Sequence, residues 1–397
     1  MSFSDYFPET FNGKIINRFS PDALAELPWE VELDLKNKAL KTLLKEGNIK
    51  APLLPVEPSP LPRHYRTTGK RRVSFSGNRL FFHMGRSHKG TSVSESLLEP
   101  ESHQEIYQLL HRFFSSPRAR AAALALNYCI IRGSYREHAL IFNVRNLNGD
   151  IVRILKQAAQ TVIADHPIVR SVFIYVDETN SDYYLEAERP EGKLAFKKLC
   201  GPEYLALQLD GKKFLYHPTS FSQINESILP VFLSKLEEAA NIPEKSLLID
   251  LYCGYGLWSL CAGRQFSSVW GAEFAAESVK MAKKNAQFHY PEKDFRYEAG
   301  SINNQFIRTK LPPVRGKKEC ILLDPPRNGC LPGVIEGVIS RRPGKILHMF
   351  CGADAIVPEL SVYLANGCKI EKLIPFDFFP GTQNVELLAV IEPPKVK

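Results

Sequence analysis

The segment Leu248-Ile-Asp-Leu-Tyr-Cys-Gly-Tyr-Gly256 decides the fold of this chain. Its apolar start predicts a buried strand, and its two glycines predict a tight turn that opens a helix. Glycines at such a turn let the backbone approach a ligand closely, at the carboxyl end of the strand. Glu273 follows 17 residues after Gly256, where a carboxylate can accept both hydroxyls of a ribose. The third glycine of a dinucleotide site is replaced by Ser259, so an adenosyl cofactor without phosphates fits better.

Strands that alternate with helices follow this segment to the end of the chain. The alternation predicts a largely parallel sheet with helices on both faces. The last two strands have no helix between them, so the final strand should run antiparallel at or near the edge. Seven strands with this ending indicate an α/β, Rossmann-like class I methyltransferase fold with a mixed sheet rather than a dehydrogenase. The strands are expected at 247–252, 269–273, 295–299, 320–323, 346–350, 369–376 and 385–391.

Three further motifs carry candidate reactive groups, and the first two should lie at the same edge of that sheet. Leu322-Leu-Asp-Pro-Pro-Arg-Asn-Gly329 ends one strand in a rigid, acidic turn. Cys351 ends the next strand, although an isolated cysteine is more often an inert core residue. Glu386 lies in an apolar setting at the start of the last strand, where it is either a proton acceptor with a raised pKa or a surface residue.

The positive charge of the chain is concentrated in one stretch. The formal net charge is +8, and residues 61–90 alone carry +8 with no acidic residue. Tyr65, Phe75, Phe81 and Phe82 are interleaved with these charges. Basic groups with aromatic rings suit a phosphate backbone and stacked bases, and the alternative is a solvated basic face. The basic residues are Arg63, Arg66, Lys70, Arg71, Arg72, Arg79, Arg86 and Lys89.

Composition excludes several classes of protein. With 44% hydrophobic and 24% charged residues, the chain has ordinary globular usage rather than that of a disordered or fibrous protein. No apolar run approaches the length of a membrane span, and the first residues lack a signal-peptide pattern. The eight cysteines include no Cys-x-x-Cys pair, so neither a disulfide framework nor a metal or iron–sulfur site is expected. We expect a cytoplasmic monomer.

The region before the alternating pattern divides in two. Residues 1–60 are expected to form an N-terminal extension with one helix near 33–45, followed by a Pro-rich linker. Residues 61–215 are expected to form an α+β RNA-recognition domain, and residues 216–397 the methyltransferase domain. The α+β domain should contain strands near 122–131 and 138–145, and a hairpin turn at Asp210-Gly211.

Together these motifs resemble the RNA uracil-5-methyltransferase family, whose members include bacterial tRNA and ribosomal RNA 5-methyluridine enzymes. The resemblance covers residues 200–397, and His64-Tyr-Arg66 is similar to an early RNA-contacting segment of the family. The chain departs from the family where Cys351-Gly352-Ala353 replaces the usual Cys-Asn-Pro, and where the N-terminus lacks a cysteine cluster and a clear small β-barrel. The matching segments are Ser220-Phe-Ser-Gln-Ile-Asn225, Asp250-Leu-Tyr-Cys-Gly-Tyr-Gly256, Asp324-Pro-Pro-Arg-Asn-Gly329, Cys351 and Phe379-Pro-Gly-Thr-Gln-Asn-Val-Glu386.

The resemblance implies an enzyme that uses S-adenosylmethionine to form 5-methyluridine in tRNA or rRNA. It implies that Cys351 is the nucleophile that attacks carbon 6 of uracil, that Glu386 is the base, and that Arg327 lies near the target base. Two other interpretations stay open: a methyltransferase acting on another acceptor, or an RNA-binding or RNA-folding protein with little catalysis. The cofactor site implied by the resemblance and the glycine motif consists of Gln223, Tyr252, Gly254, Glu273 and Asp324.

Overall fold

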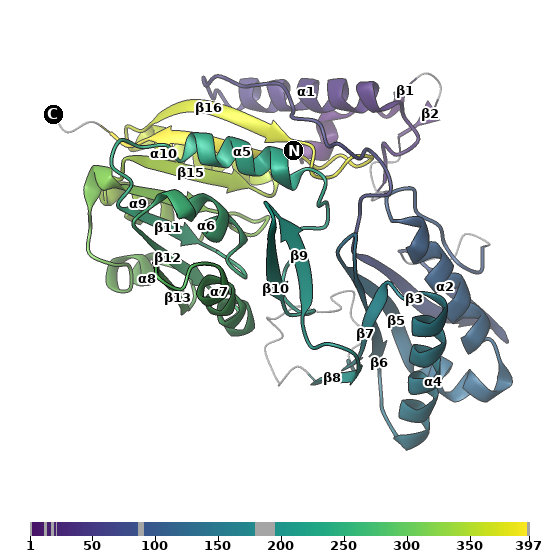
Figure 1. Ribbon diagram of the computed structural model, residues 1–397. Coiled ribbons are helices and arrows are strands. Elements are labelled where there is room, and N and C mark those ends of the chain that lie inside the picture. Colours follow the sequence, from purple (N-terminus) through teal and green to yellow (C-terminus); the bar gives the residue numbers. More distant parts are fainter. Residues whose placement is uncertain are drawn as a thin grey trace. The chain divides into compact units, whose positions relative to one another are not determined.

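The computed structural model describes residues 2–11, 14–16, 20, 22–85, 91–178 and 195–394, and these form two compact units (Figure 1). The first unit contains Met1–Pro62, Gln208–Phe214 and Ser227–Lys397. The second unit contains Arg63–Leu207 and Leu215–Glu226.

The first unit is built on a seven-stranded sheet with the order β13-β12-β11-β14-β15-β17-β16. The five strands from β13 to β15 are parallel, and β17 runs antiparallel to both of its neighbours. The predicted α/β fold with a seven-stranded mixed sheet is therefore confirmed. The strands are β11 (Leu247–Leu251), β12 (Ser268–Glu273), β13 (Asp294–Ala299), β14 (Glu319–Leu323), β15 (Lys345–Phe350), β16 (Lys369–Phe376) and β17 (Glu386–Glu392).

The proline-rich segment before residue 62 closes one edge of this sheet. Leu53 and Glu57 form parallel bridges to Leu373 and Phe376 of β16, the edge strand. Prolines are tolerated here because an outer segment has one side free of ladder bonds. The segment predicted as a linker is therefore part of the first unit.

Helices cover both faces of the sheet. On one face of the sheet, α1, α8, α9 and α10 share a hydrophobic core with the odd-numbered residues of β11. On the opposite face of the sheet, α6 packs against β11 and lies between α5 and α7. Figure 1 shows α1 lying along β16. The helices are α1 (Trp29–Glu46), α5 (Leu229–Ala239), α6 (Leu257–Ala262), α7 (Ala276–His289), α8 (Asn304–Thr309), α9 (Val334–Ser340) and α10 (Ile356–Ala365). Short pieces are the strands β1 (Thr10–Phe11) and β2 (Lys14–Ile15) and the 3-10 helices η1 (Phe3–Tyr6), η3 (Gly263–Gln265), η4 (Gly316–Lys318) and η5 (Ala353–Ala355).

The second unit is a six-stranded sheet with the order β4-β3-β5-β6-β7-β8. Helices α2 and α4 share one hydrophobic core with one face of this sheet. The strands are β3 (Gly69–Ser76), β4 (Arg79–His83), β5 (Leu126–Gly133), β6 (His138–Val144), β7 (Val169–Val176) and β8 (Ala195–Cys200), and the helices are α2 (Glu101–Phe114), η2 (Pro117–Ala119), α3 (Arg120–Ala125) and α4 (Gly149–Asp165).

One predicted strand of this unit begins later than expected. The strand expected from residue 122 starts at Leu126, because Arg120–Ala125 forms the short helix α3. Four of these six residues are alanine, the best helix former, which outweighs the apolar run that suggested a strand. The predicted hairpin turn is confirmed: Asp210 and Gly211, between β9 (Leu205–Leu209) and β10 (Lys212–Tyr216), have φ angles of 52° and 69°.

The boundary between the two units also differs from the domain boundary that was expected near residue 216. Residues 215–226 belong to the second unit. The buried Arg132 guanidinium holds this segment by donating hydrogen bonds to the carbonyls of Pro218 and Ser220, at 2.6 and 2.8 Å.

Candidate active site at the carboxyl edge of the sheet

The glycine turn after β11 forms as the sequence predicts. Tyr252, Gly254 and Gly256 all have positive φ, at 68°, 53° and 84°. A side chain at Gly254 would meet no atom within 4 Å, so the space beside this turn is open. The Gly254 N–H donates a hydrogen bond to Glu273 Oε2 at 3.2 Å, which brings the turn against the end of β12.

The ends of β14, β15 and β17 bring the predicted reactive groups together. The Cys351 thiol donates a hydrogen bond to Asp324 Oδ1 at 3.0 Å. Both Asp324 and Cys351 are close enough to Glu386 to affect its pKa. Trp258 Nε1 donates to the other Asp324 oxygen at 3.2 Å. Cys351 and Asp324 were expected at one edge, and the structure places them in contact, with Glu386 within electrostatic reach. Trp258 was not expected, because no motif singles it out.

Burial controls the ionisation of this group. It raises the pKa of Glu386 to about 8, with a further increase from Asp324 and opposition from Arg327 and the Cys351 hydrogen bond. It also raises the pKa of the Cys351 thiol well above its ordinary value, helped by Asp324 and Glu386 and opposed by Arg327. The pKa of Asp324 is raised by burial too, against the hydrogen bonds from Cys351 and Trp258. The free site therefore holds a thiol and a neutral Glu386 near pH 7.

Arg327 belongs to the same group. Its guanidinium lies 5.7 Å from the centre of the Phe379 ring, and it lowers the pKa of both Cys351 and Glu386. Its backbone packs on the cysteine loop, since a Cβ added at Gly352 would lie 2.4 Å from the Arg327 carbonyl oxygen. Glycine at position 352 therefore leaves room for the backbone of the Asp-Pro-Pro-Arg turn.

The loop that precedes Glu386 is held from the N-terminal helix α1. Lys36 and Asp377 form an ion pair at 2.5 Å, and both side chains are completely buried. Lys36 Nζ also donates to the Phe379 carbonyl, and Glu32 accepts the Gly381 N–H at 2.7 Å. The N-terminal extension, for which the sequence suggests no role, therefore fixes the approach to Glu386.

Two predicted cofactor residues are placed differently from the rest. Gln223 lies in the second unit, whereas Tyr252, Gly254, Glu273 and Asp324 lie in the first, so its part in the site stays a prediction. The Tyr252 hydroxyl is buried beside the Cys330 thiol, and burial raises its pKa, with Cys330 and Glu359 adding to the increase.

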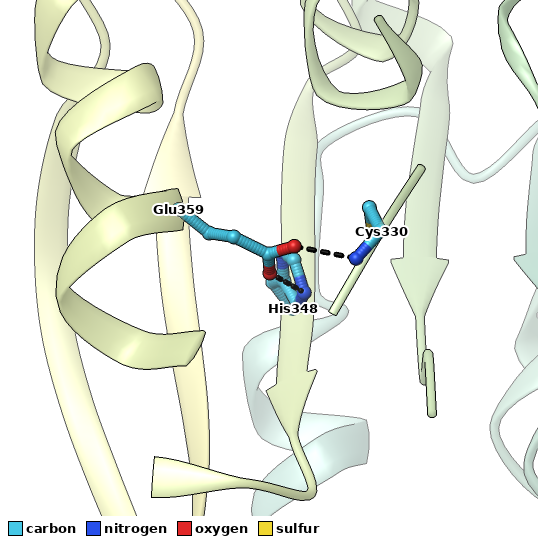
Figure 2. Close-up of side chains that lie close together, drawn as sticks. All are labelled: Cys330, His348 and Glu359. Carbon is cyan, nitrogen blue, oxygen red and sulfur yellow. Dashed lines mark hydrogen bonds and ion pairs between the residues drawn. The ribbon is translucent and has the colours of Figure 1, made fainter. Parts of the chain in front are cut away.

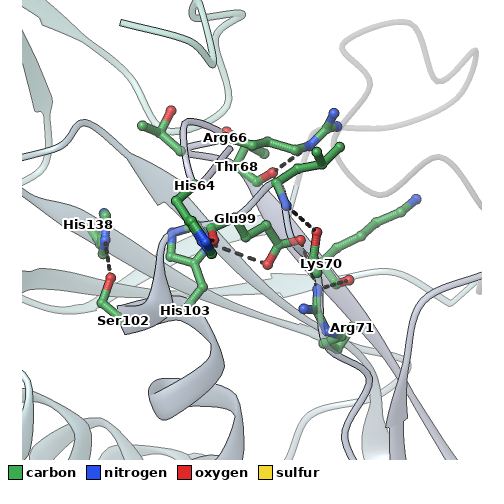
Figure 3. Close-up of polar contacts among 12 residues, drawn as sticks. His64, Arg66, Thr68, Lys70, Arg71, Glu99, Ser102, His103 and His138 are labelled. Atoms are coloured by element: carbon green, nitrogen blue, oxygen red, sulfur yellow. Dashed lines mark hydrogen bonds and ion pairs between the residues drawn. The ribbon is translucent and has the colours of Figure 1, made fainter. Parts of the chain in front are cut away.

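The basic strand of the second unit alternates between its two faces. Lys70 and Arg72 lie on one face, each with its cation within 5.5 Å of the Tyr128 ring centre. Arg71 between them is 1% exposed and donates to Glu99 Oε1 at 2.9 Å (Figure 3). Burial alone would raise the pKa of Glu99, but Arg71 and His103 hold it at about 2. Arg71 is therefore a core residue rather than an RNA contact, and Arg86 and Lys89 lie outside the described residues.

Structural comparison confirms the class of fold. The chain is similar to the crystal structure of Pyrococcus abyssi tRNA (uracil-54, C5)-methyltransferase in complex with S-adenosyl-L-homocysteine. The TM-score is 0.70 at 20% sequence identity, over 96% of this chain and 91% of that one. The fold is that of a class I methyltransferase.

Sequence comparison identifies the relatives. Residues 192–294 match the family model of tRNA (Uracil-5-)-methyltransferase. The chain is 26% identical over 370 residues to an uncharacterized RNA methyltransferase of Thermotoga maritima, over 91% of this chain and 80% of that protein. It is 30% identical over 230 residues to the tRNA (uracil(54)-C(5))-methyltransferase of Saccharomyces cerevisiae, over 54% of this chain and 35% of that enzyme. The chain is thus related to the RNA uracil-5-methyltransferases, and the resemblance seen in its motifs is confirmed.

Among the described residues, no helix is both long and apolar enough to cross a bilayer.

Proposed function

We propose that this chain is an S-adenosylmethionine-dependent RNA methyltransferase that forms 5-methyluridine through a covalent Cys351–uracil adduct. The observation that carries the proposal is the contact of Cys351 with Asp324, with Glu386 within electrostatic reach, at the sheet edge of a methyltransferase fold. The relatives with specific names act on tRNA by those names, so we propose a uridine of tRNA as the substrate. We also propose that the enzyme acts as a monomer in the cytoplasm.

Cys351 begins the reaction, because carbon 5 of uracil is a poor nucleophile by itself. As the Cys351 sulfur bonds to carbon 6, its proton passes to Asp324, which already accepts the thiol hydrogen bond. The electron pair of the 5,6 double bond then becomes available at carbon 5. Covalent catalysis of this kind divides one difficult step into easier ones.

Glu386 ends the reaction. After carbon 5 has gained its methyl group, the proton on that carbon must leave so that the sulfur–carbon 6 bond can break. A carboxylate with a pKa of about 8 is a far stronger base than an ordinary glutamate, and the burial of Glu386 supplies this basicity. Arg327 would balance negative charge on the ring and the two carboxylates.

The cofactor site would be formed by the glycine turn, Glu273 and Asp324. S-adenosylmethionine, when bound, supplies an electrophilic methyl group on a positively charged sulfur. The residues fit such a ligand, because the space at Gly254 is open and the carboxylates of Glu273 and Asp324 interact electrostatically with each other. Two carboxylates at one edge of the sheet favour a positively charged ligand. Gln223 is retained as a proposed cofactor contact.

The experiment that tests this function is Cys351→Ala with Cys368→Ala as the control. Cys368 is a buried cysteine of the same unit, outside the site. We expect C351A to lose both methyl transfer to uridine carbon 5 and any RNA adduct that survives a denaturing gel, while it still binds S-adenosylmethionine. C368A should retain all three properties. Methylation by C351A would favour another acceptor, and a wild-type protein that binds RNA without methylating it would favour an RNA-binding role.

A further inference from the structure

Three ligand-type side chains meet in the first unit (Figure 2), and none of them is a residue of the proposed active site. Cys330 lies in the turn after β14, His348 in β15 and Glu359 in α10. The thiol sulfur, one ring nitrogen and one carboxylate oxygen all lie within 4.8 Å of one another. We propose that Cys330, His348 and Glu359 form a zinc site. The proposal is independent of the proposed function.

The spacing of the two hard ligand atoms suits one shared ion. His348 Nε2 and Glu359 Oε2 lie 3.2 Å apart, yet neither has a hydrogen-bond partner of acceptable geometry among the described residues. Two ligand atoms that each lie about 2.0–2.1 Å from one tetrahedral zinc ion are about 3.3 Å apart. Their lone pairs both point at the ion and not at each other, so the two atoms are not aligned for a hydrogen bond. A separation of 3.2 Å without hydrogen-bond alignment is therefore what a shared ion requires.

The surrounding contacts fix these atoms for that role. His348 Nδ1 is hydrogen-bonded to the Tyr363 hydroxyl at 3.0 Å, which orients the ring and leaves Nε2 for a metal. The ring also stacks on Phe350 at 4.2 Å. Glu359 Oε1 accepts the Cys330 backbone N–H at 2.5 Å, so the carboxylate is held by one oxygen and presents the other.

Burial makes the present arrangement costly without an ion. The His348 side chain is completely buried and that of Glu359 is 12% exposed. A buried nitrogen or oxygen without a hydrogen-bond partner of good geometry is energetically unfavourable. An ion would satisfy the nitrogen, the oxygen and the thiolate together.

The donor set selects zinc among common metals. Thiolate, imidazole and carboxylate are the zinc ligands of proteins, whereas calcium and magnesium take oxygen ligands only. Three protein ligands leave a fourth position, which we assign to a water molecule held by the Tyr252 hydroxyl, since that hydroxyl is buried beside the Cys330 sulfur. The ion would then tie the turn that follows Asp324 to the strand that ends at Cys351.

The site cannot be predicted from the sequence, because Cys330 and His348 are 18 residues apart, His348 and Glu359 are 11 residues apart, and the three lie in different elements. No Cys-x-x-Cys or Cys-x-x-His spacing exists there, and no metal was expected from the sequence for that reason. Only the parallel pairing of β14 with β15 brings Cys330 to His348.

The test is metal binding by the full-length protein. After removal of metal with a chelator, the protein is titrated with zinc, and bound zinc is counted by elemental mass spectrometry. Cobalt provides a second measurement, because a cysteine thiolate bound to Co²⁺ gives a charge-transfer absorption band. We expect one ion per chain, a cobalt–thiolate band, and a higher melting temperature with zinc. Cys330→Ser should lose the band and weaken zinc binding at least tenfold, and Cys368→Ser should change neither.

Two results would overturn the proposal. The first is the absence of stoichiometric zinc and cobalt binding by folded wild-type protein, which would leave the three residues as a hydrogen-bonded cluster. The second is an unchanged cobalt band in folded C330S. Should C330S fail to fold, Glu359→Gln keeps the shape of the side chain and must still weaken zinc binding.

Discussion

Cys351 and Asp324, 27 residues apart in sequence, share a hydrogen bond of 3.0 Å between Sγ and Oδ1. The thiol proton therefore already points at the carboxylate that would accept it. This arrangement reconciles two facts that otherwise conflict: burial raises the pKa of the thiol, yet the proposed reaction needs a thiolate. In the proposed reaction, the thiolate would form during attack and would not be present beforehand.

Asp324→Asn should slow adduct formation. The amide cannot take the Cys351 proton, and removal of a positioned proton acceptor costs about 10²–10⁴-fold in rate. Single-turnover accumulation of the RNA adduct on denaturing gels measures the effect. Trp258→Phe is the control, because it removes the second hydrogen bond to Asp324 but leaves the carboxylate that accepts from Cys351, and it should have a smaller effect. Adduct formation by D324N at the wild-type rate would exclude Asp324 as the acceptor.

Glu386→Gln should stall the reaction after covalent attack. The amide is close in shape to the carboxyl but cannot remove the carbon 5 proton, so adduct should accumulate while turnover is lost. The wild-type enzyme should show kcat/KM rising with pH, with the midpoint of the rise near pH 8, the pKa to which burial raises Glu386. Normal turnover by E386Q would remove this residue from the mechanism.

The same substitution should change the pH dependence of stability. Glu386 has a pKa of about 8 in the folded protein and an ordinary value of 4.5, so the folded state binds more protons between these values. The wild-type free energy of unfolding should therefore fall relative to E386Q as pH rises from about 5 to 8, by a few kcal/mol at most. Urea unfolding of both proteins across this range measures the difference. A constant difference would mean that Glu386 is ionised in the fold.

Lys36→Met should destabilise the first unit by about 3–5 kcal/mol, because it leaves the buried Asp377 carboxylate unpaired. The double variant K36M/D377N removes both charges and should recover part of the loss. Denaturant unfolding of the single and double variants gives the coupling energy. A coupling near zero would show that the helix α1 does not hold the Glu386 loop through this pair.

RNA binding should depend on Lys70 and Arg72 and not on Arg71. K70Q/R72Q should lower the slope of log affinity against log salt by about 0.7–0.9 for each RNA phosphate that the variant no longer neutralises. The exposed pair Lys41 and Lys283 of the first unit gives a control with the same charge change, K41Q/K283Q. An unchanged slope in K70Q/R72Q would place the RNA surface elsewhere.

Arg71→Gln should act through stability instead. It removes one partner of a pair that is 1% and 6% exposed, so we expect a lower melting temperature. Folded R71Q should retain the wild-type salt slope. A reduced slope at unchanged stability would contradict the inward placement of Arg71.

Gly352→Ala should impair catalysis through the neighbouring turn. Its added Cβ would lie 2.4 Å from the Arg327 carbonyl oxygen, so the Asp-Pro-Pro-Arg turn must shift. A displacement of about 1 Å near reacting groups can cost about 10²-fold in rate. We expect a lower kcat with little change in cofactor affinity. Gly149→Ala, which meets no atom within 4 Å, is the control and should be neutral.

The sequence alone determined the fold class and most of the candidate site. Its alternation of strands and helices predicted the seven-stranded sheet, because apolar periodicity is a local property. It also predicted that Glu273, Asp324 and Cys351 would share one edge, since each ends a strand and parallel strands end together. The glycine turn and the Asp210-Gly211 hairpin could also be predicted from the sequence, because positive φ angles favour a few residue types, glycine above all.

Tertiary structure alone decided which polar residues are buried and what they contact. Lys36 reaches Asp377 across 341 positions, and Arg71 turns inward to Glu99 while Lys70 and Arg72 lie on the other face. A run of charges looks the same in sequence whichever face it lies on, because burial depends on what packs above each strand. The cluster of Cys330, His348 and Glu359 has the same origin: strand pairing brings its members together, and local sequence carries no trace of that pairing.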